Sequence, residues 1–446
     1  MRLPSAVVGD AQTSGFAWRT LTELVDVGNR MAGQEGERRG ATVVRDAFDD
    51  AGCRDPHVEE FEIPGWWRGS SSLEVHEPHR RVHDGQQDVL ALPGCTAGEA
   101  TGRVVDVGDG TEAEFDAAGD LDGAVVLASS DTPESADRWI HRMEKYVNAA
   151  ARGADAFVFR NHLDGSLPPT GEVGYHERPG DIPAVGVSCE VGKRLARYAD
   201  AGCEVTVSVD CRNEPTTSRN VVADVGPDTD EAVLLTAHVD AHDVSEGAND
   251  NGAGSAIVAE VGRLLTDVDL DTRVRLITFG SEEIGLWGAY HAADALDLDD
   301  VRCVVNLDGA GSSRSLRVHT NGFDSVKRVF AGVTADFDAP LVTDDTISPH
   351  GDQWAFVQEG VPAVMASTVS EQSGRGWGHT HADTLDKLDS RDLRDVATLV
   401  AEAVARLAAD DADTPHRSRE AMRDAIDPGY EQELKLGGRW PYDDLE

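Results

Sequence analysis

Six side chains that can hold and use metal ions follow one another along the second half of the chain, and they are its strongest functional signal. They are His238, Asp250, Glu282, Glu283, Asp308 and His379. Four of the five motifs that carry them directly follow a short apolar run or begin the helix after one. Open α/β sheets bind ligands outside the carboxyl ends of their strands. The set therefore indicates hydrolysis at a two-metal centre.

The first motif ends an apolar run with a histidine and an aspartate two residues apart, His238 and Asp240. The histidine can offer one ring nitrogen to a metal ion. The aspartate points to the same side of an extended chain and can accept the N–H of the other ring nitrogen, which fixes the tautomer. Taken alone, such a pair fits a surface hydrogen bond as well as a metal site.

The second motif surrounds Asp250 with glycines, from Gly247 to Gly254, at the start of an expected helix. Glycines there permit a close approach of the backbone. A carboxylate has two oxygens and can bridge two cations, which a histidine cannot. The alternative is an ordinary helix cap, because aspartate and asparagine are favoured at that position.

The third motif places two carboxylates side by side, Glu282 and Glu283, after the apolar run 273–279. Adjacent carboxylates repel each other unless a cation or a proton separates their roles. One can bind a metal while the other acts as a general base on water. The alternative is two solvated acids in a chain that contains 82 of them.

The last two motifs place Asp308 after another apolar run and His379 in a loop after the expected strand near residue 364. A turn with side-chain to backbone hydrogen bonds is the alternative for each. In combination, two histidines and three carboxylates supply nitrogen and oxygen ligands suited to zinc or a similar divalent ion. Glu282 remains as the base, and two ions about 3.5–4 Å apart can stabilise a tetrahedral oxyanion.

The elements around these motifs alternate between strand and helix. Expected strands cover 233–237, 274–279, 301–307 and 361–366, and an amphipathic helix follows Gly254. Such alternation predicts an α/β fold with a doubly wound, mostly parallel sheet. Residues 15–53 read as helical, and residues 58–105 read as short strands and turns.

Residues 100–212 are expected to form a separate, smaller β/α module without a catalytic cluster. Its expected strands are 123–128, 156–159 and 182–187, and its expected helices are 143–151 and 191–199. The chain then divides into the N-terminal part of the main domain at 1–99, the inserted module at 100–212, the main domain with the metal site at 213–410, and a tail at 411–446. We expect the charged, irregular tail to pack loosely.

The charge balance excludes two classes of partner. The 446 residues include 40 basic and 82 acidic ones, for a formal net charge of −42. A nucleic-acid binder needs the opposite sign, and an anionic membrane would repel this chain. Dispersed acidity with only five lysines is typical of proteins from salt-loving organisms, where molar salt screens self-repulsion over about 3 Å. An ordinary acidic protein is the alternative.

The chain shows neither a signal-peptide h-region nor 18 consecutive apolar residues, so we expect a cytoplasmic protein without a membrane span. A homodimer is left open. Among the six cysteines, Cys303 is expected to be a buried thiol. Cys203 and Cys211 are close enough in sequence for a disulfide, although nothing demands one.

The five motifs together resemble those of the co-catalytic zinc exopeptidases, which include zinc aminopeptidases, glutamate carboxypeptidase II and carboxypeptidase Q. The shared patterns are HxD, GAxDNGxG, EExGLxG, NLDxxG and HTxxDT. Three further stretches look most like carboxypeptidase Q, namely 30–33, 63–69 and 238–254. The resemblance covers about residues 20–410. It implies that the module at 100–212 is a protease-associated (PA) domain.

The resemblance implies a role for each residue. Asp250 would bridge two zinc ions, with cobalt or manganese as other divalent candidates. His238 and Asp308 would complete one site, and Glu283 and His379 the other. Glu282 would be the base, and Asp240 would orient His238. His381 is a rival to His379. A cis peptide bond would follow the bridging aspartate, between Asp250 and Asn251.

The expected activity is exopeptidase cleavage of short peptides or dipeptides, as an aminopeptidase, a dipeptidase or a carboxypeptidase. One alternative is a glutaminyl cyclase or amidohydrolase of the same fold, and another is a catalytically silent binding protein. A substrate carboxylate could meet Arg314, Arg317 or Arg375, and Arg375 and Trp377 could line the pocket.

Overall fold

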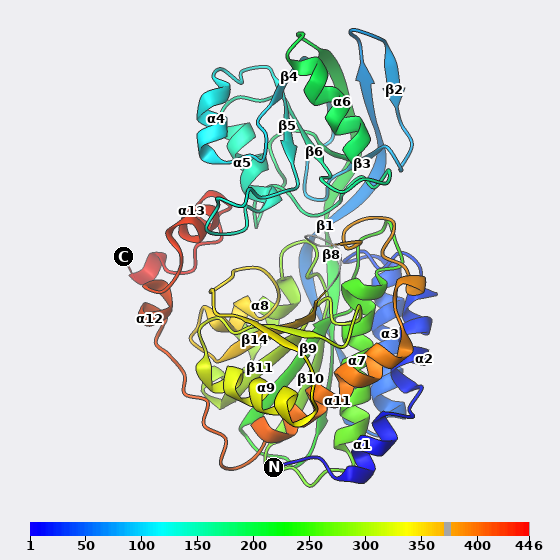
Figure 1. The fold of residues 1–446 in the computed structure, drawn as a ribbon, viewed down its shortest axis with the longest axis vertical. Coiled ribbons are helices and arrows are strands. Elements are labelled where there is room, and N and C mark those ends of the chain that lie inside the picture. Colours follow the sequence, from blue (N-terminus) through cyan, green and yellow to red (C-terminus); the bar gives the residue numbers. More distant parts are fainter. Residues whose placement is uncertain (370–375, 446) are drawn as a thin grey trace.

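The computed structural model describes residues 1–369 and 376–445 as two lobes joined by a pair of long strands (Figure 1). These strands are β1 (Arg54–Val75) and β8 (Glu204–Val225), which pair antiparallel from Arg54 opposite Asp224 to Val75 opposite Val205. The sequence predicted only short segments over 58–105. Pairing with β8 instead carries β1 without a break from the lower lobe into the upper one.

The lower lobe is built on a mostly parallel sheet. Its strand order is β13 (Leu341–Asp344), β12 (Leu316–His319), β14 (Ala363–Thr368), β11 (Val301–Leu307), β9 (Ala232–His238), β10 (Arg273–Phe279) and β8. The four central strands β14, β11, β9 and β10 are parallel, while β12 and β8 each join an end antiparallel. The carboxyl ends of the central strands therefore share one edge.

Helices cover both faces of this sheet, as the alternating pattern predicted. On one face lie α1 (Ser5–Ala11), α2 (Phe16–Val25), α3 (Glu35–Asp50), α7 (Ala253–Leu265), α9 (Asp324–Asp336) and α11 (Ser390–Leu407). On the other lie α8 (Trp287–Ala295) and α10 (Trp354–Val357). Burial of both faces explains why the central strands are continuous apolar runs. The predicted α/β doubly wound class is confirmed.

The upper lobe has its own parallel strands. They are β4 (Gly98–Asp106), β5 (Val125–Ser129), β6 (Ala156–Arg160) and β7 (Ala184–Val187), with β3 (Val89–Ala91) antiparallel to β7 and β2 (Arg81–His83) paired with β1. Its helices are α4 (Glu112–Ala118), α5 (Arg142–Ala151) and α6 (Cys189–Ala199). The expected elements of the inserted module are present. The predicted domain bounds at 99/100 and 212/213 stay predictions, although β8 continues past residue 212.

The prediction of a loosely packed tail was wrong. The chain beyond residue 411 forms α12 (Arg419–Arg423) and α13 (Pro428–Leu436), and α13 packs against α5 of the upper lobe. Tyr430 and Leu434 lie one helical turn apart on α13 and are buried. Arg439 forms an ion pair with Glu172. The apolar stripe is short and its residues are separated by charged ones, so the sequence did not predict that the tail packs.

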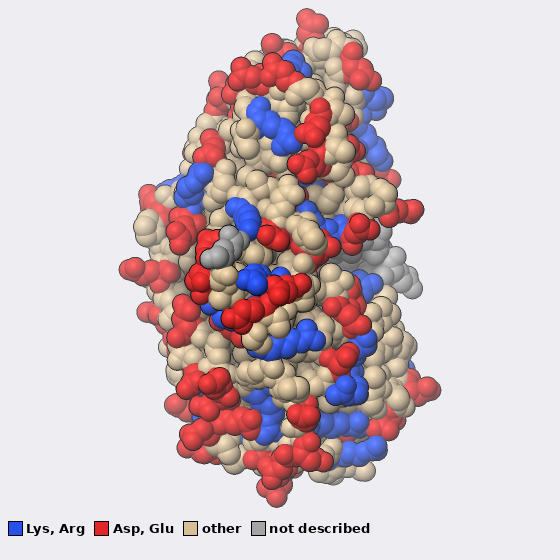
Figure 2. Space-filling model, turned by 90° about the vertical axis from the view of Figure 1, so that its left-hand side faces the viewer, with Lys and Arg blue, Asp and Glu red and all other residues tan. Residues whose placement is uncertain are grey.

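Three further facts bear on the expectations from composition. Single-turn helices lie at Leu298–Asp300, Leu385–Lys387 and Asp443–Leu445, and no helix in the described ranges is both long and apolar enough to cross a membrane. All six cysteines are free thiols, and Cys303 is buried as predicted. Figure 2 shows acidic side chains spread over both lobes on the face in view.

Candidate metal centre

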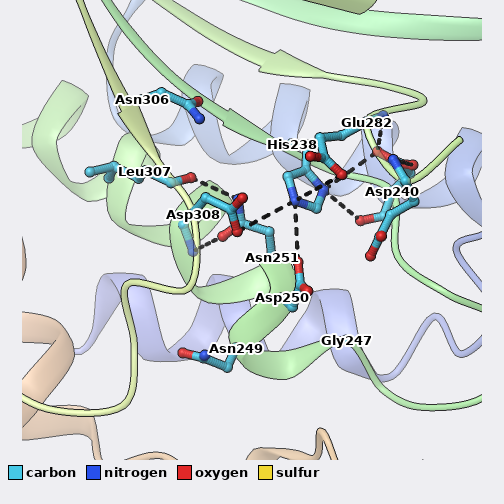
Figure 3. Close-up of polar contacts among 12 residues, drawn as sticks. His238, Asp240, Gly247, Asn249, Asp250, Asn251, Glu282, Asn306, Leu307 and Asp308 are labelled. Carbon is cyan, nitrogen blue, oxygen red and sulfur yellow. Dashed lines mark hydrogen bonds and ion pairs between the residues drawn. The ribbon is translucent and has the colours of Figure 1, made fainter. Parts of the chain in front are cut away.

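The predicted metal-binding residues converge at the carboxyl edge of the lower sheet, and Figure 3 shows His238, Asp250, Glu282 and Asp308 among them. His238 ends β9, Asp308 follows β11, and Glu282 and Glu283 follow β10. These three strands are neighbours, so their ends meet although the residues lie far apart in the sequence. Asp250 comes from the irregular turn Ala248–Gly252 directly before α7.

Asp250 lies between two imidazoles. Its Oδ1 atom is 3.3 Å from Nε2 of His238, and its Oδ2 atom is 3.3 Å from Nε2 of His379. One carboxylate thus presents one oxygen to each of two histidines. This is the arrangement that a carboxylate bridging two cations requires.

Each histidine has further carboxylates around it. Nε2 of His238 lies 3.9 Å from Oδ1 of Asp308 and 4.0 Å from Oε2 of Glu282. Nε2 of His379 lies 3.1 Å from Oε2 of Glu283. The centre therefore has two halves, which we call the His238 half (His238 and Asp308) and the His379 half (His379 and Glu283), with Asp250 between them.

The structure places His379, not His381, in the centre. The Nδ1–H group of His379 donates to the carbonyl of Thr170 at 3.2 Å, and the amide of Thr170 donates back to the carbonyl of His379 at 2.8 Å. This exchange of hydrogen bonds uses Nδ1, so Nε2 is the nitrogen that faces Asp250. His381 belongs to neither half of the centre.

Asp240 holds several parts of the centre at once. Its Oδ1 atom is 3.5 Å from Nδ1 of His238, and its backbone carbonyl is nearer, at 3.1 Å. Its two carboxylate oxygens accept the amides of Glu282 and Glu283, at 3.1 and 3.2 Å. The hydrogen bond that orients His238 is thus accepted by the backbone carbonyl of Asp240 rather than by its carboxylate, which instead fixes the Glu282–Glu283 turn.

The turn that carries Asp250 is held by residues for which the motifs gave no role. Asp383 accepts the amides of Asn249 and Asp250 at 2.9 and 3.0 Å. The Asn251 side chain donates to the carbonyl of Leu307 at 2.7 Å. The peptide bond between Asp250 and Asn251 is cis, as the resemblance implies.

His242 is a residue of the centre that sequence reasoning missed. Its Nε2 atom lies 2.8 Å from Oε2 of Glu283, and its ring meets the ring of His379 edge-on at 4.5 Å between centroids. His242, Glu283 and His379 offer atoms that all lie within 4.8 Å of one another. The available signal was the alternation of His238, Asp240 and His242 along one extended run.

Burial and neighbouring charges act strongly on these groups. Burial and Glu283 raise the pKa of Asp250, but the imidazoles of His238 and His379 outweigh them and hold it below its ordinary value. Burial raises the pKa of Glu282 well above its ordinary value, against the effect of His238. Burial also lowers the pKa of His242 and keeps its ring neutral. The pKa values of the two carboxyl groups are thus moved in opposite directions, down for Asp250 and up for Glu282.

The residues fit divalent metal ions. Within the described ranges, Nε2 of His238, both ring nitrogens of His242 and Oε2 of Glu283 are buried without a hydrogen-bond partner. Orphaned polar atoms of this kind are costly unless a ligand satisfies them. Imidazole nitrogen and carboxylate oxygen are the donors that zinc and neighbouring divalent ions use.

Two of the cavities that reach the centre are lined by its carboxylates. One contains Asp250 and Asp308 and is also lined by Arg317 and Trp377. The other contains Glu282 and is also lined by Arg439. Arg314 lies instead on the surface, with half of its side chain exposed and a distant ion pair at 3.7 Å. Arg375 lies outside the described residues.

Comparison with known sequences finds two matching families. Residues 220–404 match the profile of peptidase family M28, and residues 94–195 match that of the PA domain. Residues 220–404 are thus similar to peptidase family M28. The prediction of a zinc-dependent peptidase that contains a PA domain is thereby confirmed.

Curated relatives of this chain align over most of their length. It is 26% identical over 410 residues to aminopeptidase YwaD of Bacillus subtilis, covering 87% of this chain and 83% of that one. It is 27% identical over 420 residues to carboxypeptidase Q of Bos taurus, covering 91% and 87%. Both aminopeptidases and carboxypeptidases are therefore among its relatives.

Solved structures share the fold. An aminopeptidase from Aneurinibacillus sp. strain AM-1 superposes with a TM-score of 0.69 at 26% identity, covering 93% of this chain and 100% of that one. A peptidase M28 precursor from Shewanella amazonensis reaches a TM-score of 0.77 at 23% identity, covering 93% and 98%. The second likeness concerns the fold alone.

Proposed function

We propose that this peptidase binds two divalent ions, zinc in the first place with cobalt or manganese as substitutes, and cleaves short peptides or dipeptides next to a free terminus. The observation that carries the proposal is the position of Asp250. Each of its oxygens lies 3.3 Å from a different imidazole nitrogen, and each imidazole has its own carboxylate partner.

The ligands divide between the two halves of the centre. His238 and Asp308 would hold one ion, Glu283 and His379 would hold the other, and Asp250 would contact both. Bound there, divalent ions supply Lewis acidity, which polarises the scissile carbonyl and lowers the pKa of the attacking water. Nδ1 of His238 and Nδ1 of His379 are used in hydrogen bonds, so Nε2 is the ring nitrogen that each would offer to an ion.

Glu282 is the proposed general base. Its carboxylate lies at the edge of the His238 half, 4.0 Å from Nε2 of His238, and it lines a cavity that opens from the centre. Glu282 would take a proton from the attacking water and pass it to the leaving amine. Asp240 would set the geometry of this step, because it holds the amides of both glutamates.

Known relatives support an exopeptidase. They include an aminopeptidase and carboxypeptidase Q, and a solved relative from Bacillus subtilis at 25% identity is described as a zinc aminopeptidase. These names differ in the terminus that is removed. The proposal therefore commits to a short peptide with at least one free terminus.

The experiment that tests the general base is Glu282→Gln. Without a proton acceptor, kcat should fall by about 10²–10⁴-fold, while metal content and circular dichroism stay those of the wild type. Glu177→Gln, at an exposed position of the upper lobe, is the matched control and should keep full turnover. Turnover of Glu282→Gln near the wild-type rate would show that another group is the base.

The terminus that the enzyme requires can be found with dipeptides. A panel with free, N-blocked and C-blocked termini would be assayed in molar salt with and without a chelator. Loss of cleavage on blocking one end identifies the terminus that is bound. Cleavage that persists in chelator after dialysis would contradict a metal-dependent peptidase.

A further inference from the structure

His242 is placed at the His379 half of the metal centre without a role in the proposed mechanism. It lies in the loop after β9, and its side chain is 3% exposed. Nε2 of His242 is 2.8 Å from Oε2 of Glu283, and that same oxygen is 3.1 Å from Nε2 of His379. The Glu283 oxygen thus lies between two imidazole nitrogens.

The contact between His242 and Glu283 does not have the direction of a hydrogen bond. Despite the short distance, neither Nε2 of His242 nor Oε2 of Glu283 has a hydrogen-bond partner among the described residues, and Nδ1 of His242 has none either. A buried imidazole with both nitrogens unsatisfied carries an uncompensated desolvation cost. A cation shared with Glu283 would remove that cost.

The spacing of the donor atoms suits a single metal ion. Around the His379 half, neighbouring donor atoms are 2.8, 3.1 and 3.3 Å apart, for the pairs His242–Glu283, Glu283–His379 and His379–Asp250. A tetrahedral ion with bonds of about 2.0–2.1 Å separates its ligand atoms by roughly 3.3 Å. These three distances are therefore close to those that one ion would impose on its ligand atoms.

The loop that carries His242 is firmly held. The next residue, Asp243, receives Nε and Nη2 of Arg68 at 3.0 and 2.7 Å. Arg68 also donates to Oγ1 of Thr170 at 3.0 Å, and the backbone of Thr170 holds His379. The backbone segments that carry both imidazoles are thus held by one hydrogen-bond network. Fewer side-chain conformations would be lost when an ion binds.

We propose that His242 is a protein ligand of the ion that Asp250, Glu283 and His379 hold. The inference rests on the proposed function, since it assigns an added ligand to one of its two sites. The halves are then unequal, with one imidazole in the His238 half and two in the His379 half. Nitrogen-rich sites favour zinc, nickel or copper over manganese and magnesium, so the His379 half should keep zinc longer against a chelator.

X-ray absorption at the zinc edge tests this directly on the zinc-loaded full chain. Three imidazoles over two ions give an average of about 1.5 imidazole ligands per zinc, whereas His238 and His379 alone would give about 1.0. His242→Gln should lower the count to about 1.0 and weaken one of the two zinc sites by more than the 10–100-fold typical of an outer partner. His381→Gln is the matched control and should leave both the count and the affinities unchanged.

A wild-type count of about 1.0 would by itself overturn the inference, because His242 would then only position Glu283. This result needs no variant, so it stands even if His242→Gln folds poorly. It also differs from failure of the proposed function, in which the wild type would bind no zinc at the centre at all.

Discussion

The two halves of the metal centre are built in different ways. The His238 half takes its ligands from the ends of two adjacent parallel strands, β9 and β11, inside one lobe. The His379 half takes them from the β10 turn and from a loop whose position depends on the backbone of Thr170 in the other lobe. The geometry of one proposed ion site therefore depends on the sheet alone, whereas that of its neighbour depends on the contact between the two lobes.

Asp250 joins the halves, so its substitution should have the largest effect. Asp250→Ala removes an oxygen from both proposed ions and leaves His238 and His379 without the carboxylate between them. We expect both affinities to fall by more than 100-fold, beyond the range for an outer partner, and activity to be lost. Metal content after dialysis is the measurement. Loss of only one ion would show that Asp250 does not bridge.

Arg68→Met should lower metal affinity in one half of the centre and not in the other. The substitution removes the side chain that donates hydrogen bonds to both Asp243 and Thr170. His242 and His379 would then be positioned less firmly. We expect metal affinity in the His379 half to fall about 10–100-fold, with the His238 half unchanged, as measured by equilibrium dialysis. Arg212→Met, at a half-exposed position on β8, is the control. Equal weakening of both ions would contradict the division into halves.

Much of this centre could be predicted from the sequence, and the part that could not has a physical reason. Hydrophobic runs in the sequence predict the strand ends and the helix start that carry five of the residues, namely His238, Asp250, Glu282, Glu283 and Asp308. The support of His379 could not be read this way, because its partner Thr170 is 209 residues away and contributes only backbone atoms. Asp383 was part of a motif, yet nothing local shows that it holds the Asp250 turn.

The fold also has parts that the sequence predicts and parts that it does not. Buried parallel strands and amphipathic helices follow from local patterns, and they were found close to their expected limits. The length of β1 and the packing of α13 depend on partners elsewhere in the chain, β8 and α5. A short apolar stripe such as Tyr430 and Leu434 does not predict packing by itself, because its burial depends on a surface elsewhere in the chain.

A smaller effect concerns the pH dependence of the stability of the upper lobe. In the upper lobe, burial lowers the pKa of Lys145 to about 8 from an ordinary 10.5. Between these two values the unfolded chain binds more protons than the folded one, so this lysine makes stability rise with pH from about 8 to 10.5, by up to a few kcal/mol. Lys145→Met should remove that rise, as followed by denaturant unfolding. Lys193→Met, at an exposed site, should keep it.

The smallest predicted effect is on the chain as a whole. With a net charge of −42, self-repulsion should weaken as salt rises from about 0.1 to 1 M and the screening length falls from about 10 to 3 Å. We expect the melting temperature to rise by several degrees, to a similar extent in the wild type and in the Lys145 variant. A melting temperature that stays flat or falls with salt would contradict a salt-adapted surface.

Anomalous diffraction at the zinc edge from crystals of the zinc-loaded protein tests the central claim most directly. The account predicts two peaks about 3.5–4 Å apart, one beside His238 and Asp308 and one beside Glu283 and His379, with a different oxygen of Asp250 toward each. A single peak, or two peaks that do not share Asp250, would contradict it.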